Sequence, residues 1–566
     1  MMATWEQIAK AKRENLSKLI PEKWKLKDPV PSADVLRDVT GSYVQQFLTP
    51  REIEITETDA VGIVQHTTTG KWTAVEVTEA FCHRAALAHQ LVNCLHEIFF
   101  DAAIEQAKEL DAYFAKHGRP IGPLHGLPVS LKDQFHVKGV ETTMGYVGWV
   151  GTFQGIKNDP RAKVFESELV RELRELGAVL HCKTSVPTSL MVGETINNLI
   201  GYTWNPTNRH LSSGGSSGGE GALIALRGSP AGFGTDIGGS VRIPSAFNGI
   251  YGIRPSAGRI PYEGAANSMD GQNSILSVIG PLATSVRSLK LLFQSVLSTK
   301  PWLHDPLAIE IPWRDTVEEE VLSLTKGKGQ LAFGILHDDG VVRPQPPVAR
   351  ALRIVEATLK RLGHKIIEWK PPSHLTAGAL AEQIYSLDSG ADISHHLNLS
   401  GEPLPPQVEL IHGRDKQKTA QEIAAINVAK REYQKAYLDY WNSTASLTGT
   451  GRPVDGFLSP VAPWAAVMPS KYTYILYTLY VNTLDYTSVV FPVTKADKSI
   501  DVAPSDYTPL SDADKVVYDN YDPEIYHGAP VGLQLVGRRL QEEKMLALAE
   551  YISHELQNDG TARVSL

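Results

Sequence analysis

Long hydrophobic runs, basic clusters and paired cysteines are all missing from this chain of 566 residues. No stretch approaches about 18 consecutive apolar residues, the length that a bilayer requires, so we predict no membrane span. The first 26 residues, MMATWEQIAKAKRENLSKLIPEKWKL, carry mixed charge and lack the apolar segment of a signal peptide. We therefore expect a cytoplasmic protein that has no membrane partner.

Metal-binding and nucleic-acid-binding patterns are also missing. The three cysteines, Cys82, Cys94 and Cys182, are odd in number and none lies in a CxxC pair, which argues against a disulfide framework and a zinc ribbon. The 18 histidines are scattered without a metal-ligand spacing, so we predict no metal site. With 55 basic and 63 acidic residues and no Lys/Arg-rich run, nucleic acid is not an expected partner.

What is present is an ordinary globular composition, with 42% hydrophobic and 21% charged residues. Helical spacing and strand-like runs alternate to the end of the chain, which predicts a mixed α/β architecture on a large sheet. Proline-rich residues 301–347 and acidic residues 496–527 are expected to be surface connections. The helices are predicted over 5–19, 73–116, 161–176, 346–362 and 416–440, and the strands over 127–132, 178–184, 365–369, 455–460 and 531–537.

Two common nucleophile and nucleotide motifs fit poorly. GGSSG at 214–218 matches the GxSxG nucleophile elbow, but the polar segment before it is not the strand that an elbow requires. The glycines of 232–239 have neither the dinucleotide nor the phosphate-loop spacing. Cys182 lies beside Lys183 inside a predicted strand, where an inert buried thiol is commoner than a nucleophile.

The segment TDIGGS at 235–240 offers a serine at the end of a glycine-rich turn. Because glycine has no Cβ, successive N–H groups can converge there as in an oxyanion hole, which makes Ser240 the better nucleophile candidate. A serine without histidine needs another base. Lys132 ends an apolar strand, and burial would lower its pKa from about 10.4 toward neutrality. Asp133 would point to the opposite side of the strand and need not hold a charge on Lys132.

These segments together resemble the amidase signature family. GLPVSLKD at 126–133, GGSSGGEGA at 214–222 and GTDIGGSVRIPSAF at 234–247 are similar to its three signature pieces, in order and at the family's spacing. The segments TSVPTSLMVGETINN, RPSAGRIPY and DPEIYHGAPVGLQLVGRRL resemble the acetamidase or general-amidase branch of filamentous fungi. The resemblance covers nearly the full length.

The resemblance implies one amidase signature domain over 1–566, built on a large mixed central β-sheet covered by helices on both faces. Within it we expect four successive regions. They are a helical N-terminal layer (1–90), the signature core (91–300), a variable helical and loop region that shapes the pocket (301–480) and the C-terminal part of the sheet (481–566).

The resemblance also implies a Ser-Ser-Lys triad, with Ser240 as nucleophile, Ser216 as bridging serine and Lys132 as base. A cis peptide bond is implied at Gly215–Ser216, and no metal or cofactor is required. The other implied residues fall into three groups: an oxyanion hole of Ile237, Gly238, Gly239 and Ser240; supporting residues Asp236, Arg242, Ser217 and Thr235; and substrate-binding residues Ser189, Leu190, Met191, Gly214 and Gly215.

The activity implied is hydrolysis of small carboxylic acid amides, acetamide-like, aromatic or aryl-acyl, to the acid and ammonia or an amine. The substrate is then a small molecule, and a homodimer is one oligomeric state left open. Two alternatives also stay open: a glutaminase subunit of an amidotransferase and a non-catalytic amidase-like binding protein. A fatty-acid amide hydrolase is less favoured, because the polar N-terminus offers no apolar anchor.

Overall fold

A mixed sheet of eleven strands forms the centre of the protein, for which the computed structural model describes residues 3–326, 329–406, 408 and 416–558. The strand order is β1-β3-β2-β6-β8-β7-β12-β13-β11-β9-β10, and β4 and β5 pair separately. The strands are β1 Leu95–Ile98, β2 Pro128–Lys132, β3 Val179–Thr184, β4 Ile196–Asn197, β5 Gly201–Tyr202, β6 Ala231–Asp236, β7 Tyr251–Arg254, β8 Val278–Ala283, β9 Ala332–Ile335, β10 Lys365–Glu368, β11 Gly456–Pro460, β12 Ser488–Lys495 and β13 Pro530–Val536.

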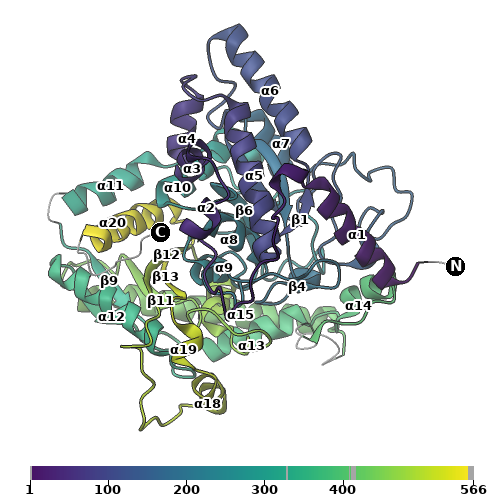
Figure 1. Ribbon diagram of the computed structural model, residues 1–566. Helices are drawn as coiled ribbons and strands as arrows, with labels where there is room; N and C mark the ends of the chain where they lie inside the picture. Colours follow the sequence, from purple (N-terminus) through teal and green to yellow (C-terminus); the bar gives the residue numbers. More distant parts are fainter. Residues whose placement is uncertain (1–2, 327–328, 407, 409–415, 559–566) are drawn as a thin grey trace.

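Helices cover this sheet on both faces, which confirms the predicted fold class (Figure 1). The α-helices are α1 Trp5–Leu19, α2 Ser42–Gln45, α3 Pro50–Glu57, α4 Ala60–Thr67, α5 Ala74–Val92, α6 Phe100–His117, α7 Glu168–Glu175, α8 Gly218–Ala225, α9 Arg242–Asn248, α10 Val286–Ser298, α11 Asp315–Lys326, α12 Pro346–Arg361, α13 His374–Tyr385, α14 Ala391–Asn398, α15 Ala420–Ser443, α16 Ala445–Thr448, α17 Leu476–Leu484, α18 Asp512–Asp519, α19 Pro523–Tyr526 and α20 Glu542–Asn558. Short 3₁₀ turns occupy Glu22–Trp24, Val147–Trp149, Thr188–Leu190 and Pro301–Leu303.

Three predicted elements differ from the structure. The helix predicted over 73–116 is two helices, α5 and α6, separated by strand β1, because Asn93 ends α5 in the left-handed conformation (φ 59°). The helix predicted over 161–176 begins only at Glu168, after a series of turns. The segment 301–347 is more than a connection, since it contributes helix α11 and strand β9 to the body of the protein.

The site is positioned by two neighbouring parallel strands, β2 and β6. Ser130 lies opposite Gly232 and Leu131 opposite Phe233, so the carboxyl ends of both strands reach the same edge of the sheet. Residues that follow parallel strands at one edge are the usual place for a binding site in α/β proteins. Lys132 and the loop after Asp236 therefore leave the sheet side by side.

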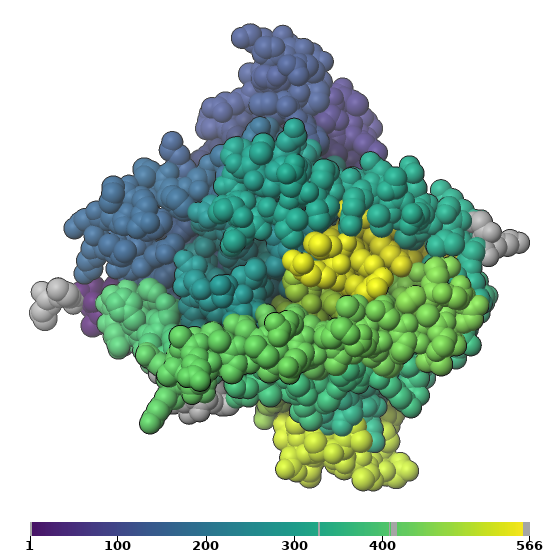
Figure 2. Space-filling view, turned by 180° about the vertical axis from the view of Figure 1, so that it is seen from behind, coloured from purple at the N-terminus to yellow at the C-terminus, as the bar shows by residue number. Residues whose placement is uncertain are grey.

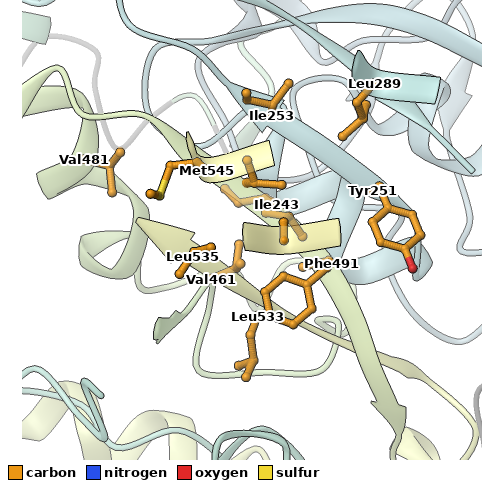
Figure 3. Close-up of a cluster of buried hydrophobic side chains, with 14 of the residues drawn as sticks. Ile243, Tyr251, Ile253, Leu289, Val461, Val481, Phe491, Leu533, Leu535 and Met545 are labelled. Carbon is orange, nitrogen blue, oxygen red and sulfur yellow. The ribbon is translucent and has the colours of Figure 1, made fainter. Parts of the chain in front are cut away.

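The helix that follows this loop is held by the core. In Figure 3, Ile243 of α9 lies among apolar side chains of β12 and β13, with Phe491 and Leu533 labelled. These three side chains are buried. The loop between β6 and α9 is consequently attached at one end to the sheet and at the other to a helix packed on it.

Later parts of the chain close the back of the molecule. Figure 2 shows α20 in yellow at the surface, between the teal segment above it and the green segments below it. Among the helices of the described ranges, none has both the length and the apolar character that crossing a bilayer would take.

Candidate active site

Lys132 stands at the end of β2 with its side chain fully buried. Its Nζ lies 2.8 Å from Ser216 Oγ and 2.7 Å from Thr235 Oγ1. Burial lowers the pKa of Lys132 from its ordinary value to about 7, against the opposing attraction of Asp236 and Glu220. An amine with such a pKa is available as a base near neutral pH.

Asp133 is turned away from Lys132, as the alternation of a strand requires. Its carboxylate lies 2.6 Å from Lys183 Nζ and accepts hydrogen bonds from Thr143 and from the N–H of Met144. Burial alone would raise the pKa of Asp133, but His96 and Lys183 outweigh it and hold that pKa well below its usual range. Asp133 is thus a separately paired anion that does not hold the charge of Lys132.

The glycine-rich turn at 214–218 carries Ser216, and the peptide bond Gly215–Ser216 is cis, as the family resemblance implies. A Cβ on Gly215 would lie 2.7 Å from the carbonyl oxygen of Val192, so only glycine fits there. Ser217 N–H donates to the carbonyl of Ser240 at 3.2 Å. This bond joins the turn to the loop that follows β6.

That loop, residues 236–242, is folded around the carboxylate of Asp236. The carboxylate accepts the N–H groups of Gly239 (2.9 Å) and Val241 (3.2 Å) and forms a fully buried ion pair with Arg242 at 3.0 Å. Burial favours the protonated acid, but Arg242 outweighs it and holds the pKa of Asp236 well below its usual range. Asp236 and Arg242 are therefore buried together rather than forming an exposed pair.

The backbone of this loop presents free donors around Ser240. Within the described ranges, the N–H groups of Ile237, Gly238 and Ser240 have no hydrogen-bond partner, whereas that of Gly239 is committed to Asp236. Gly239 has φ +124°, a conformation that favours glycine. Of the four expected oxyanion donors, three are thus free to meet a ligand.

Ser240 itself is 8% exposed and lies beside Ser217. In the described part of the chain, no hydrogen bond joins Ser240 Oγ directly to Ser216 Oγ. Such catalytic hydrogen bonds are often long in an enzyme without substrate and tighten in the complex. The structure therefore brings Lys132, Ser216 and Thr235 into direct contact and places Ser240 next to them through the backbone.

The outer side of the loop is held by helices α13 and α17. The Tyr385 hydroxyl donates to the carbonyl of Ile237, and Thr478 Oγ1 donates to the carbonyl of Gly238 at 2.6 Å. Asn482 donates to Asp236 at 2.8 Å. No sequence pattern pointed to these three contacts, because Tyr385, Thr478 and Asn482 lie far from the signature segments.

A cavity of about 630 Å³ opens between α13 and the segment 470–479. Ile475 and Leu479 line it, and each has a Cδ1 at 3.6 Å from the place of a Cβ on Gly238, so the cavity adjoins the loop of Ser240. The other lining residues are Met191, Val192, Gly193, Glu194, Leu375, Gly378, Ala379, Glu382, Tyr385, Ser386, Pro406, Ser470, Tyr472, Thr473, Tyr474 and Leu476.

The expected substrate-binding residues divide between this cavity and the buried interior. Met191 lines the cavity, while Ser189 and Leu190 are buried just before it with positive φ values of 67° and 65°. Gly214 and Gly215 are buried in the turn that carries Ser216. The substrate-binding assignment of these five residues stays a prediction.

Cys182, the other nucleophile considered, is fully buried in β3. Burial raises the pKa of its thiol well above the ordinary value, which opposes formation of the reactive thiolate. Across the described residues, no group of three or more His, Cys, Asp or Glu side chains could hold a metal ion.

A buried lysine that contacts a serine can act as a base, and a neighbouring loop with free N–H groups and a second serine has the groups that an oxyanion hole and a nucleophile need. The Amidase family model matches residues 76–546. The chain belongs to the amidase signature family and is an amide hydrolase of that family.

The similar proteins narrow the branch. The chain is 48% identical to an acetamidase of Aspergillus oryzae, over 97% of this chain and 98% of the relative. It is 45% identical to an acetamidase of Emericella nidulans over 99% of each chain. A solved structure described as a fatty acid amide hydrolase superposes with a TM-score of 0.88 at 35% identity, over 97% of this chain and 94% of the other. The resemblance to the amidase signature family and its fungal acetamidase branch is confirmed.

Proposed function

We propose that the protein hydrolyses small carboxylic acid amides to the acid and ammonia through an acyl-enzyme on Ser240. The main observation in support is that Lys132 is fully buried and that its Nζ lies 2.8 Å from Ser216 Oγ, beside the loop of Ser240. Burial keeps a large share of Lys132 neutral near pH 7, since its pKa is about 7. A neutral amine can take the proton that a serine nucleophile must lose.

In the first half-reaction, Lys132 takes a proton from Ser216, and Ser216 takes one from Ser240 as Ser240 Oγ bonds to the amide carbonyl carbon. The carbonyl π electrons move to oxygen and form a tetrahedral oxyanion. Ser216 then protonates the leaving nitrogen while Lys132 returns its proton to Ser216. The C–N bond breaks, ammonia leaves, and the acyl group stays on Ser240 as an ester.

In the second half-reaction, water takes the place of ammonia. It loses a proton to Ser216 as it attacks the ester carbonyl, and Ser240 regains a proton when the C–O bond breaks. The free acid leaves. The unpaired N–H groups of Ile237, Gly238 and Ser240 are the proposed donors to the oxyanion in both halves.

Two observations support the acyl groups that we propose. The acetamidases at 45% and 48% identity support acetamide and its close analogues. The cavity of about 630 Å³ beside Gly238 is of the size that holds drug-sized ligands, which supports acyl groups larger than acetyl. We therefore propose primary amides from acetamide to aromatic amides as the substrate range.

An ammonia-release assay over acetamide, propionamide, benzamide and glutamine tests the proposal, with Ser240→Ala as the comparison. We expect the wild type to release ammonia from at least one of the first three amides and the variant to stay at background. Turnover of glutamine alone would support the amidotransferase-type glutaminase. A wild type no more active than Ser240→Ala on every amide would support the non-catalytic binding protein.

A further inference from the structure

Gln134 follows Lys132 by two positions and is buried on the side where β2 ends. Its side-chain amide contacts three groups. Nε2 donates to the carbonyl of Ala266 at 2.6 Å and to the Tyr262 hydroxyl at 2.8 Å, while Oε1 accepts from Thr235 Oγ1 at 2.7 Å. These contacts connect it to Lys132, because Thr235 Oγ1 lies 2.7 Å from Lys132 Nζ.

The orientation of this amide is determined by its neighbours. A backbone carbonyl can only accept, so the atom of Gln134 that faces Ala266 must be the NH₂ group. Oε1 then faces Thr235. The backbone also holds the residue in place, since the N–H of Ala266 donates to the carbonyl of Gln134 at 3.0 Å.

From this amide, each hydrogen bond sets the direction of the next. Oε1 of Gln134 only accepts, so the single hydroxyl proton of Thr235 points at Gln134. Thr235 can then only accept from Lys132, which spends one N–H on that bond. A neutral amine has one lone pair, and with an N–H directed at Thr235 this lone pair is left to receive the proton of Ser216.

We propose that Gln134 is a positioning residue that sets the direction of the proton relay, acting through Thr235 so that Lys132 accepts a proton from Ser216. This inference rests on the function proposed above. Without the amide oxygen, the Thr235 hydroxyl is free to donate to Lys132 and to occupy the lone pair that the reaction needs.

The acidic residues near Lys132 are engaged with other partners, so neutral groups are left to orient its amine. Asp236 is paired with Arg242 at 3.0 Å, and Asp133 is paired with Lys183 at 2.6 Å. Glu220 accepts from Ser130 at 2.6 Å and from Thr184 at 3.0 Å. In the described structure, the contacts of Lys132 Nζ itself are with the hydroxyls of Thr235 and Ser216.

A double-mutant cycle with Gln134→Met and Thr235→Val tests the inference, read as kcat and KM for ammonia release. We expect each single variant to lower kcat roughly 10-fold to 100-fold, less than or at the low end of the 10²–10⁴-fold that general-base catalysis supplies, with little change in KM. Because Gln134 acts through Thr235, the double variant should lose no more than Thr235→Val alone. Thr235→Ser, which keeps the hydroxyl, should restore most of kcat.

Two further variants keep the test decisive. Gln345→Met removes a buried amide that donates to the carbonyl of Val517, far from Lys132 along the chain, and should leave kcat unchanged. Gln134→Glu places a carboxylate one hydroxyl away from Lys132. It should move the acid limb of kcat/KM upward by about one pH unit, the low end of the effect of a close opposite charge.

Wild-type kcat in Gln134→Met, losses that multiply in the double variant, or an unmoved acid limb in Gln134→Glu would each overturn the inference. If Gln134→Met does not fold, the pH profile of Gln134→Glu and the comparison of Thr235→Ser with Thr235→Val decide. A wild type without activity, or an active Ser240→Ala, would instead refute the proposed function, so the two failures are distinguishable.

Discussion

The catalytic loops and the cavity beside them are built in different ways. The loops at the ends of β2 and β6 are buried and held by polar contacts: Asp236 pairs with Arg242 and Gly239 a few residues on, and Lys132 contacts Ser216 of another signature segment. The cavity wall comes mainly from α13 and the segment 470–479, far along the chain, with residues 191–194 completing it, and it is largely apolar. The proposed proton relay therefore lies within the signature segments, whereas most of the wall of the cavity that we propose for the acyl group comes from distant ones.

The largest effect should come from removing the base. Lys132→Ala should lower kcat on the order of a thousandfold or more, because Ser216 then has no group to take its proton. Adding Ser240→Ala should lower the rate little further, since the residues of one relay act as a unit. Ammonia release with each variant measures this, and near-normal turnover in Lys132→Ala would remove Lys132 from the mechanism.

Asp236→Asn should have the next largest effect, on the stability of the whole molecule. It leaves the buried guanidinium of Arg242 without its anion, and breaking a buried pair in this way costs about 3–5 kcal/mol. Chemical denaturation measures the free energy of unfolding. Lys435→Ala, which breaks the exposed pair with Asp439, is the control and should change it by less than about 1 kcal/mol. Equal losses of unfolding free energy in the two variants would show that the buried pair of Asp236 and Arg242 stabilises the fold no more than an exposed pair.

The pH dependence of kcat/KM tests the proton relay without testing the cavity. Lys132 must be neutral to accept a proton, and its pKa is about 7. As the pH falls through 7 the amine becomes protonated, so kcat/KM should drop tenfold per pH unit, to about 1% of its plateau at pH 5. Circular dichroism at pH 5 checks that the fold persists. An acid limb near pH 4, typical of an exposed carboxylate, would point to another base.

The burial of Lys132 and the loop of N–H groups before Ser240 were predictable from the sequence, while the roles of these residues stay predictions. A strand end predicted the burial of Lys132, and GTDIGGS predicted a loop of converging N–H groups, because both follow from short local patterns. The contact of Lys132 with Ser216 spans 84 residues and was expected only from the family resemblance. The contacts of Gln134, Tyr385 and Thr478 were missed because they depend on where remote segments lie. The strand β1 inside the predicted helix over 73–116 was missed for a related reason, since its pairing partner is β3.

Tyr385 joins the two regions, because it lines the cavity and its hydroxyl donates to the carbonyl of Ile237. That carbonyl belongs to the same peptide group as the N–H of Gly238. Tyr385→Phe should lower kcat roughly 10-fold, less than the 10²–10³ that loss of an oxyanion donor costs. Tyr477→Phe removes a similar buried bond to the carbonyl of Val342 and should leave kcat unchanged. Equal kcat values in the two variants would show that the hydrogen bond from Tyr385 in the cavity wall does not affect the reaction.

The smallest effect should be a change in the preference for the acyl group, with the proton relay left intact. Ala379 lines the cavity on α13, and Ala379→Leu narrows it. Propionamide and benzamide should then lose roughly 5-fold to 10-fold in kcat/KM, at or below the low end of what one methylene in a pocket is worth, while acetamide is unaffected. Parallel losses on all three amides would show that the cavity does not hold the acyl group.

The most direct test of the account is to identify the acylated residue. The enzyme is mixed with a substrate amide or its activated ester, quenched in acid within milliseconds, and digested for peptide mass spectrometry. We predict the acyl mass on Ser240, within the peptide that spans GTDIGGSVR, and its absence in Ser240→Ala. Acylation of Cys182, or steady turnover with no acyl group on Ser240, would contradict the account.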